Sequence, residues 1–482
     1  MARKNKGQII TKNITDIIGP DMLLYAAATT VRGLPSCIDG LKVTQRKILF
    51  SLWKNKTYGN TQKNNKNVGD TATYVPTGDS SIYGALIRMG QIERYKYPLI
   101  KSQGNYGYIS NGLDTYAAQR YTEGALSDFA KDMYFTEDFE SVPFVDEGDP
   151  RYAYPSFLPC VVPMSLVLGT NGVGVGYKNN CPPHTLKSIG NAYIKWIEKI
   201  NSSQEKSNIA IAKGIKLGFP NKTQLIDDKS MVKGLITGKG RVIVEGIVEV
   251  QDHSYSRKKL VITELPHLVG VPSFIESVKA NPQAKELFSN IHDYSSKEGV
   301  LIELIMKQST NINEALDFLY YGTPFRNAMN YSLLWNVDMS GKRMGIYEIF
   351  ESHYNLKIAN LINHYTKEYN DTYNKIVNYT ALKYIVTNKD RRETLFKILN
   401  KSDDESIYIH MRKAFSKGIK DYNDNVADFI INSNFRQFLN KADLLNKKIV
   451  EYNNKLENSK FIKDNPHLHL VSEINDKIRK WK

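Results

Sequence analysis

The C-terminal third of the chain carries a seven-residue apolar period, which restricts the possible folds more than any other feature. In two segments, apolar or large side chains recur at alternating spacings of four and three, so each segment predicts a long helix that packs along one face. The first series is Ile358, Ile362, Tyr365, Tyr369, Thr372 and Ile376, and the second is Phe438, Ala442, Leu445, Ile449, Tyr452 and Leu456. We predict that residues 341–482 form a long antiparallel coiled coil with a helical knob at roughly residues 387–437. An ordinary helical bundle is the alternative, and the periodicity alone slightly favours it.

The rest of the chain has a mixed pattern, so we expect an α+β protein of several domains. Residues 1–20 look like a basic N-terminal arm. Residues 21–151 contain three short helical segments, the first beginning at Asp21, separated by the polar stretch GNTQKNNKNVGD, which should be a loop. A Gly-rich, strand-like stretch (PLIKSQGNYGYIS) follows, and this order predicts a winged helix-turn-helix domain. Residues 152–340 contain the β-branched runs VIVEGIVEV, KKLVITELP and GVLIELIMK, which predict a separate α/β domain.

Composition narrows the class of protein. The chain has 482 residues and 65 Lys and Arg against 50 Asp and Glu, a formal charge of +15 that attracts polyanions such as nucleic acids. Its three cysteines lie far apart without a CxxC spacing, which argues against a zinc ribbon and suits a reducing cytoplasm. No run approaches eighteen consecutive apolar residues, so we expect no membrane span.

The stretch DTYAAQRYTE contains the strongest candidate for chemistry, because Arg120 directly precedes Tyr121. A tyrosine hydroxyl has a pKa near ~10 and is a weak nucleophile at neutral pH. An adjacent guanidinium favours the phenolate and stabilises charge on a pentavalent phosphate. The Thr-Glu pair that follows is expected to begin a helix. The bland alternative is that Tyr121 is simply one of 30 tyrosines.

Several motifs in the same order resemble those of type IIA DNA topoisomerase breakage-reunion subunits, the family of gyrase A and topoisomerase IV A. AAQRYTE is similar to the Ala-Ala-x-Arg-Tyr-Thr-Glu motif around that family's nucleophile. VRGLPSCIDGLKVTQRKILF, GDSSIYGALIRMGQ, SQGNYGYI and LVLGTNGVGVGYKNNCPPHT resemble further blocks, and GLITGKGRVIVEGIVEV with ITELPH resembles the family's tower domain. The implied architecture is a winged-helix cleavage domain, an α/β tower domain and a coiled coil ending in a helical dimerisation gate.

The resemblance implies a mechanism centred on Tyr121. Its hydroxyl would attack a DNA phosphate and form a 5′-phosphotyrosyl link on each strand of a transient double-strand break, through which a second duplex passes. Arg120 and Arg32 would bind the scissile phosphate. The family usually has His-Pro-His before Gly-Asp-Ser, and Thr77 stands in the place of the second histidine. A threonine hydroxyl can hydrogen-bond a phosphate but cannot act as a base near neutral pH. Either the base is unnecessary here, or water or a partner group replaces it.

The resemblance also implies a set of DNA-binding residues. Lys42, Arg46 and Lys47 fit positions that grip flanking phosphates, although a solvated helix face is the alternative. Ser80 belongs to the predicted recognition helix. Val173 matches the family's isoleucine wedge, which inserts between base pairs and bends the duplex, with a core valine in a Gly-rich turn as the alternative.

Cofactors and partners follow from what the sequence lacks. It has no G-x-x-x-x-G-K-[ST] loop and no convincing carboxylate set for magnesium, so we expect no metal site in this chain. The family places ATP and Mg²⁺ mainly on a partner subunit, so we expect a homodimer that joins an ATPase and metal-binding subunit on double-stranded DNA. Because the sequence ends at Lys482, it is closest in size to the medium subunit of phage-type topoisomerases. Relaxation or decatenation is then expected over negative supercoiling, in a bacterial or phage-infected cytoplasm.

Three rival interpretations remain at this level. A non-catalytic, architectural DNA-binding paralogue would keep the fold and lose cleavage, and the missing histidines favour it. A tyrosine recombinase would need its tyrosine near the C-terminus, whereas Tyr121 lies in the first third of the chain. A basic structural protein would not explain the ordered motifs.

Overall fold

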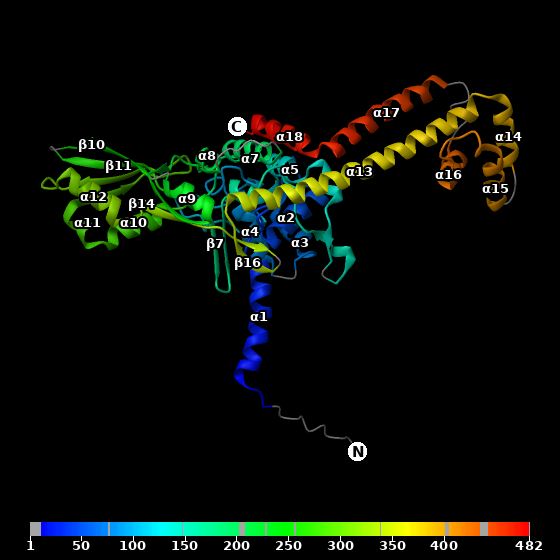
Figure 1. The fold of residues 1–482 in the computed structure, drawn as a ribbon. Coiled ribbons are helices and arrows are strands. Elements are labelled where there is room, and N and C mark those ends of the chain that lie inside the picture. The colour runs from blue at the N-terminus through cyan, green and yellow to red at the C-terminus, as the bar shows by residue number, and fades with distance from the viewer. Residues whose placement is uncertain are drawn as a thin grey trace, which may run out of the picture. The chain divides into compact units, whose positions relative to one another are not determined.

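The computed structural model describes residues 11–75, 78–146, 148–201, 208–226, 229–254, 257–337, 339–400, 404–433 and 442–481. The chain divides into two compact units. Figure 1 shows the fold as a ribbon coloured by residue number. Unit 1 comprises Met1–Lys357 with Val471–Lys482, and unit 2 comprises Ile358–Leu470. Unit 1 mixes helices and sheets, as expected for an α+β chain, and the described part of unit 2 is helical. The four predicted domains stay predictions, although the return of residues 471–482 to unit 1 was not foreseen.

The first helix is longer than expected. Helix α1 runs from Ile14 to Gly33 and contains Pro20, whereas the sequence suggested a start at Asp21. Proline within a helix removes one backbone hydrogen bond, and α1 continues through that loss. Part of the predicted basic arm is therefore helical, and residues 1–10 lie outside the described residues.

Three short helices pack on one another beside a small antiparallel sheet. They are α2 (Val43–Lys54), α3 (Asn64–Ala72) and α4 (Asp79–Gly90). The sheet has the order β1-β3-β2, with β1 at Gln62–Lys63, β3 at Glu123–Leu126 and β2 at Ile100–Gln103. Helices followed by such a sheet agree with the order expected for a winged helix, an assignment that stays a prediction.

Helix α3 corrects the predicted loop at GNTQKNNKNVGD. Its buried residues are Asn64, Asn67, Val68 and Thr71, which share the i, i+3, i+4, i+7 spacing of one helix face. Polar asparagines occupy this face, so the hydrophobic pattern gave no helical signal. The expected helix at the Thr-Glu pair after Tyr121 is also wrong. Strand β3 begins at Glu123, and the next helix, α5 (Asp128–Tyr134), begins after the Ser127 cap.

Two larger antiparallel sheets occupy residues 170–332. The five-stranded sheet has the order β6-β7-β14-β9-β8 and the four-stranded sheet the order β10-β11-β13-β12. The five strands are β6 (Thr170–Gly174), β7 (Tyr177–Cys181), β14 (Arg326–Ser332), β9 (Lys239–Glu245) and β8 (Gln224–Leu225). The other four are β10 (Ile247–Asp252), β11 (Lys258–Glu264), β13 (Ile302–Met306) and β12 (Phe288–Asp293). The expected strands are thus present, but VIVEGIVEV is split between the two sheets at Gly246.

Apolar side chains of the four-stranded sheet pack against three helices. Leu260, Ile262 and Leu304 are buried with Phe274 and Phe318 in one core cluster. The helices are α10 (Val271–Ala280), α11 (Pro282–Leu287) and α12 (Ile312–Gly322), which Figure 1 shows beside β10 and β11. This α/β layer is the part of the chain for which we predicted a tower domain.

Unit 2 contains the greater part of one long helix and the whole of a second, and the two lie side by side in opposite directions. The Lys463 ammonium lies 4.9 Å from the Tyr369 ring centre, and the Lys448 ammonium lies 4.9 Å from that of Tyr379. Residue numbers rise from Tyr369 to Tyr379 in one helix while those of their partners fall from Lys463 to Lys448 in the other, so the two helices are antiparallel. The helices are α13 (Ile346–Val386) and α17 (Ala442–Asp464). Phe438 of the predicted seam lies outside the described residues, and the identification as a coiled coil stays a prediction.

A compact helical cluster joins the two long helices. Leu395, Met411 and Ile430 are buried together within it. Its helices are α14 (Lys389–Leu399), α15 (Asp404–Phe415) and α16 (Asp424–Asn432). These elements lie in the segment predicted as a knob.

Two general properties complete the fold. Within the described ranges, no helix combines the length and apolarity needed to cross a bilayer. Cys37, Cys160 and Cys181 are buried free thiols.

Burial of His184 makes the fold sensitive to acid. Its Nδ1 lies 2.7 Å from the Leu166 carbonyl oxygen and must donate, so Nε2 accepts from the Tyr331 hydroxyl at 2.8 Å. Burial lowers the pKa of His184 to about 4, against a smaller raising effect of the Leu166 bond. Between that value and the ordinary histidine pKa, only the unfolded chain binds this proton, so the free energy of unfolding falls as pH falls.

We predict that His184→Asn flattens the pH dependence of stability between pH ~6.5 and ~4 by up to about 3 kcal/mol. Urea unfolding at a series of pH values measures it. An unchanged slope in the variant would show that His184 does not supply this acid sensitivity.

Candidate active site and nucleic-acid interface

Tyr121 projects from a short turn beside the β1-β3-β2 sheet. It ends the 3-10 helix Gln119–Tyr121, and 65% of its surface is exposed. The next residue, Thr122, is fully buried, so the chain passes from solvent to core in one step. The Arg120 guanidinium carbon lies 4.8 Å from the centre of the Tyr121 ring. The predicted nucleophile and its neighbouring cation therefore sit together on an exposed surface.

Hydrogen bonds from three elements hold Thr122 and Glu123. Its Oγ1 accepts from the Asn64 Nδ2 at 2.9 Å and lies 2.8 Å from the Tyr83 hydroxyl. Its carbonyl oxygen accepts from the Asn64 backbone N–H at 3.0 Å. The same Asn64 amide donates to the Tyr106 hydroxyl at 2.9 Å, and that hydroxyl donates to the Glu123 carbonyl at 2.7 Å. The backbone on the C-terminal side of Tyr121 is thus fixed from α3, α4 and the segment after β2.

Two glycines allow this close packing. A Cβ on Gly124 would lie 2.8 Å from the Asn64 Oδ1 and 2.9 Å from the Tyr106 hydroxyl. A Cβ on Gly104 would lie 2.9 Å from the Tyr121 carbonyl oxygen, and Gly104 has a φ of +96°. Neither position has room for a side chain, so the Tyr121 backbone rests directly on Gly104, and Gly124 lies against the side chains of Asn64 and Tyr106.

Val173 and Arg32 are brought close together at the end of α1. Val173 lies on β6 near the turn of the β6–β7 hairpin, and 66% of its surface is exposed, so its interpretation as a core residue is wrong. A Cβ on Gly33 would lie 2.0 Å from the Val173 carbonyl oxygen, and one on Gly172 would lie 2.4 Å from the Gly33 carbonyl oxygen. The backbones of α1 and β6 are therefore in direct contact, and Arg32 lies in the last turn of α1 beside the hairpin.

Arg46 and Lys47 are both buried, so the alternative of a solvated helix face is wrong for them. Arg46 is buried and its guanidinium forms two hydrogen bonds with the fully buried Asp39 carboxylate, at 2.7 and 3.2 Å. Lys47 is also buried, with its ammonium 4.0 Å from the Tyr154 ring centre. Neither side chain lies on a solvated helix face. The Arg46 guanidinium holds protein structure in place, which argues against the predicted contact with a flanking phosphate.

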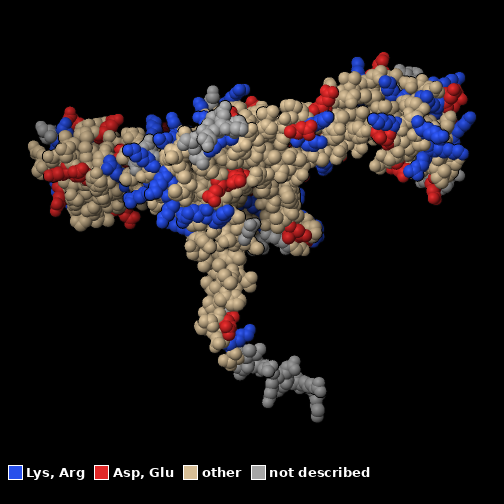
Figure 2. All heavy atoms as spheres, viewed as in Figure 1, with Lys and Arg blue, Asp and Glu red and all other residues tan. Residues whose placement is uncertain are grey.

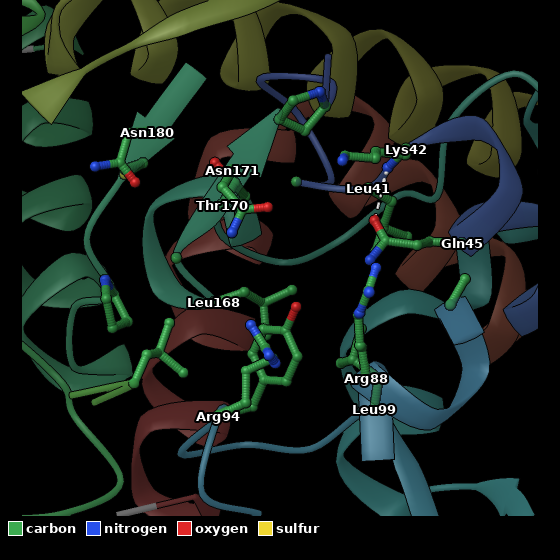
Figure 3. Close-up of a pocket in the computed structure, with 18 of the residues that line it drawn as sticks. Leu41, Lys42, Gln45, Arg88, Arg94, Leu99, Leu168, Thr170, Asn171 and Asn180 are labelled. Atoms are coloured by element: carbon green, nitrogen blue, oxygen red, sulfur yellow. Dashed lines mark hydrogen bonds between the residues drawn. The ribbon is translucent and has the colours of Figure 1, made fainter. Parts of the chain in front are cut away.

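A cavity of about 280 Å³ gathers four cationic side chains (Figure 3). Arg32 and Lys42 are two of the residues predicted to bind phosphates, a role that stays a prediction, and Arg88 and Arg94 were missed. Among the described residues that line it there is no carboxylate. In Figure 3, Lys42 and Arg88 lie on one side of the cavity and Asn180 on the other. The stretch GALIRMGQIERYK contained the two missed arginines, but only folding brings them to Lys42.

The cations of this cavity influence one another. Burial, and then Arg88, lowers the pKa of Lys42. The pKa of Arg94 is also lowered, chiefly by burial and to a smaller extent by Arg88. Tyr95 and Asp114 raise it and offset part of this shift. Crowded positive charge of this kind is offset by a bound anion. The cavity is therefore suited to phosphate groups.

The other described residues predicted to contact DNA or take part in catalysis are not among the residues that line the cavity. Ser80 is exposed in the first turn of α4, where Ser81, one residue later, lines the cavity instead. Thr77 lies outside the described residues, so its role stays a prediction. Tyr121 and Arg120 do not line the cavity in this single chain.

Basic residues also cover the sheet next to the cavity. Figure 2 shows Lys and Arg gathered over the part of unit 1 where Figure 1 labels α9 (Lys229–Thr237), β14 and β7. The exposed cations of these and the adjoining strands include Lys178, Lys233, Lys239, Arg241, Lys342 and Arg343. A polyanion bound at the cavity meets further positive charge along this surface.

The described residues contain no group of three or more His, Cys, Asp or Glu side chains that could hold a metal ion. Two positions after Tyr121 the chain has an acidic residue, Glu123, whose carboxylate pairs with Lys63 at 3.0 Å. Its side chain also accepts from the Thr61 hydroxyl at 2.9 Å. One carboxylate already engaged in this way does not by itself form a magnesium site.

Comparisons with known proteins give the family of the chain. The model of the family of DNA gyrase/topoisomerase IV A subunits matches residues 32–472. The A subunit of DNA gyrase from Mycobacterium tuberculosis (strain CDC 1551 / Oshkosh) is 34% identical over 322 residues, 65% of this chain and 38% of that protein. The A subunit of DNA gyrase from Borreliella burgdorferi is 31% identical over 355 residues, 72% of this chain and 43% of that protein. The A subunit of DNA topoisomerase 4 from Staphylococcus epidermidis is 30% identical over 358 residues, 73% of this chain and 44% of that protein. This chain spans about two fifths of the length of these relatives.

We predict that Arg46→Ala lowers the free energy of unfolding by about 3–5 kcal/mol, because it leaves the Asp39 carboxylate buried without its cation. Arg46→Lys should recover only part of the loss, since an ammonium cannot form the two-pronged contact. Urea unfolding followed by circular dichroism measures both. A variant with native stability and weakened DNA binding would instead support the predicted phosphate contact.

Proposed function

The chain belongs to the family of DNA gyrase/topoisomerase IV A subunits, and on this premise we propose that it is the DNA cleavage and religation subunit of a type IIA DNA topoisomerase. The observation that carries the proposal is the exposed Tyr121 ring beside the Arg120 guanidinium, on a turn held by the buried Thr122. A nucleophile that attacks a polymer backbone must be accessible and carried on a well-held stretch of chain; Tyr121 is exposed, and the backbone that follows it is held through Thr122.

The proposed reaction exchanges one phosphate ester for another. The Tyr121 oxygen attacks a DNA phosphorus, the bond from phosphorus to the 3′-oxygen breaks, and that oxygen leaves as a 3′-hydroxyl after taking up a proton. The phenolic proton passes to water or to a partner group, because Thr77 cannot act as a base near neutral pH. Arg120 stabilises the negative charge that develops on the phosphate oxygens. The reverse attack by the 3′-hydroxyl reseals the strand and frees Tyr121.

The DNA would be held by the cationic cavity and bent by Val173. Lys42, Arg88 and Arg94 offer charge for backbone phosphates, and we assign them this role in place of Arg46. Val173 is exposed close to Arg32, which lines the same cavity. A duplex bound by the cations of the cavity would therefore pass over the apolar Val173 side chain. Such a side chain can unstack one base step and kink the duplex.

The architecture fits a breakage-reunion subunit. We assign α2, α3, α4 and the β1-β3-β2 sheet to a winged-helix domain, and the two larger sheets to a tower domain. The antiparallel α13–α17 pair and the α14–α16 cluster are assigned to a coiled coil with a dimerisation gate. Two copies would cut opposite strands and let a second duplex pass.

Magnesium and ATP would be supplied mainly by a partner subunit. The residues around Tyr121 in the described part of the chain do not form a carboxylate set for a metal, so no step is assigned to a metal bound by this chain alone. Bound Mg²⁺ would contribute neutralisation of charge at the phosphate. A complex of two such chains with two ATPase and metal-binding subunits is the proposed active form.

We predict that Tyr121→Phe abolishes covalent attachment to DNA while it leaves DNA binding within about twofold. The two proteins are mixed with the partner subunit, Mg²⁺ and supercoiled plasmid, and quenched with detergent. Protein linked to 5′ ends only in the wild type supports the proposal. If neither protein becomes linked although both bind and bend DNA, the chain is an architectural DNA-binding protein.

We predict that Arg88→Gln lowers the slope of log binding constant against log salt concentration by about 1, because one fewer phosphate is neutralised. The exposed Lys279 on α10 provides a matched control, and Lys279→Gln should leave the slope unchanged. Fluorescence anisotropy with a duplex of about 30 base pairs at several salt concentrations measures both. Equal slopes for all three proteins would exclude the cavity from the phosphate path.

A further inference from the structure

A chain of side-chain amides leads from β1 and α3 to the residue after Tyr121. The Gln62 Nε2 donates to the Thr57 hydroxyl at 2.8 Å and to the Asn67 Oδ1 at 2.6 Å. The Asn67 Nδ2 donates to the Asn64 Oδ1 at 3.0 Å and to the Gly124 carbonyl at 3.0 Å. The Asn64 Nδ2 then donates to Thr122, as described above. Each amide fixes the orientation of the next.

Asn64 occupies the end of this chain and has every side-chain group engaged. Its two N–H groups donate to Tyr106 and Thr122, and its oxygen accepts from Asn67. Asn64 and Thr122 are both fully buried. A buried network with all donors and acceptors satisfied is rigid, since any rotation leaves a polar group without a partner.

The Tyr121 side chain, in contrast, has little around it. Most of its surface is exposed, so packing does little to orient the ring. Its position depends on the backbone on either side, and on the C-terminal side that backbone is held through Thr122 and the Glu123 carbonyl.

We propose that Asn64 is a positioning residue for strand cleavage, acting through Thr122 to hold Tyr121 at the geometry needed for in-line attack; this inference rests on the proposed role of Tyr121. Asn64 does not touch DNA in this scheme. It fixes the distance and direction of the Tyr121 oxygen relative to a phosphate that other residues bind. A displacement of about 1 Å in such a group lowers a reaction rate by roughly a hundredfold.

The test compares rates of covalent complex formation at saturating DNA, with Mg²⁺ present, in the complex with the partner subunit. Asn64→Leu and Thr122→Val remove the two partners of the central hydrogen bond with little change in volume. Each should slow cleavage by roughly tenfold to a hundredfold with DNA affinity unchanged. Thr122→Ser keeps the hydroxyl and should recover most of the rate. Asn65→Ala, on the exposed face of the same helix, is the matched control and should cleave like the wild type.

The double variant separates positioning from general damage to the fold. If Asn64 acts through Thr122, the combined loss in Asn64→Leu/Thr122→Val equals that of either single variant, whereas independent effects multiply. Circular dichroism and DNA affinity identify variants that fail to fold. If Asn64→Leu is one of them, the cleavage rates of Thr122→Ser and Thr122→Val still test whether the Thr122 hydroxyl is needed. Wild-type rates in folded Asn64→Leu, or multiplicative losses, would overturn the inference. Its failure differs from that of the proposed function, in which the wild type itself forms no link through Tyr121.

Discussion

The carboxylate of Asp39 is fully buried and accepts hydrogen bonds from the Arg46 guanidinium and from the backbone N–H groups of Leu41 and Leu158. Its own carbonyl oxygen accepts from the Tyr134 hydroxyl at 2.8 Å. This group therefore joins the loop after α1 to α2, to α5 and to a segment more than a hundred residues away. Since Arg32 and Lys42 flank that loop, the placement of cationic groups around the cavity depends on one buried charge that itself never meets a ligand.

The sequence predicted the fold where side-chain periodicity and burial coincide. The long helices α13 and α17 followed from their heptad series, and the β-branched runs gave β9, β10, β11 and β13. Helix α3 could not be predicted, because Asn64 and Asn67 face the core and their burial depends on hydrogen bonds to residues 58 and 57 positions away. The split of VIVEGIVEV at Gly246 also depends on tertiary contact, since a Cβ there would lie 2.2 Å from the Glu264 carbonyl oxygen.

The candidate site divides in a similar way. Tyr121, Arg120 and Val173 were identified from ordered motifs, and their exposure agrees with the assigned roles without testing them. Arg46 and Lys47 were assigned by resemblance to phosphate-binding positions, with a solvated helix face as the alternative, and their position in the sequence gave no sign that both side chains are buried, Arg46 against the Asp39 carboxylate. Arg88 and Arg94 were missed for the converse reason. Their spacing in the sequence gives no signal, and only the packing of α4 and the following turn beside Lys42 makes them part of one cavity.

The backbone contact of α1 with β6 has a consequence for how this surface can change over generations of sequence variation. Gly33 and Gly172 have no room for side chains, so the chain segments bearing Arg32 and Val173 behave as one piece. A substitution at either glycine would force the two segments apart and so separate the cation from the apolar tip. A change at Val173, whose side chain is exposed, leaves the backbone contact intact and alters only the length of the apolar tip. The spacing of the two groups therefore depends on two residues that have no side chain of their own.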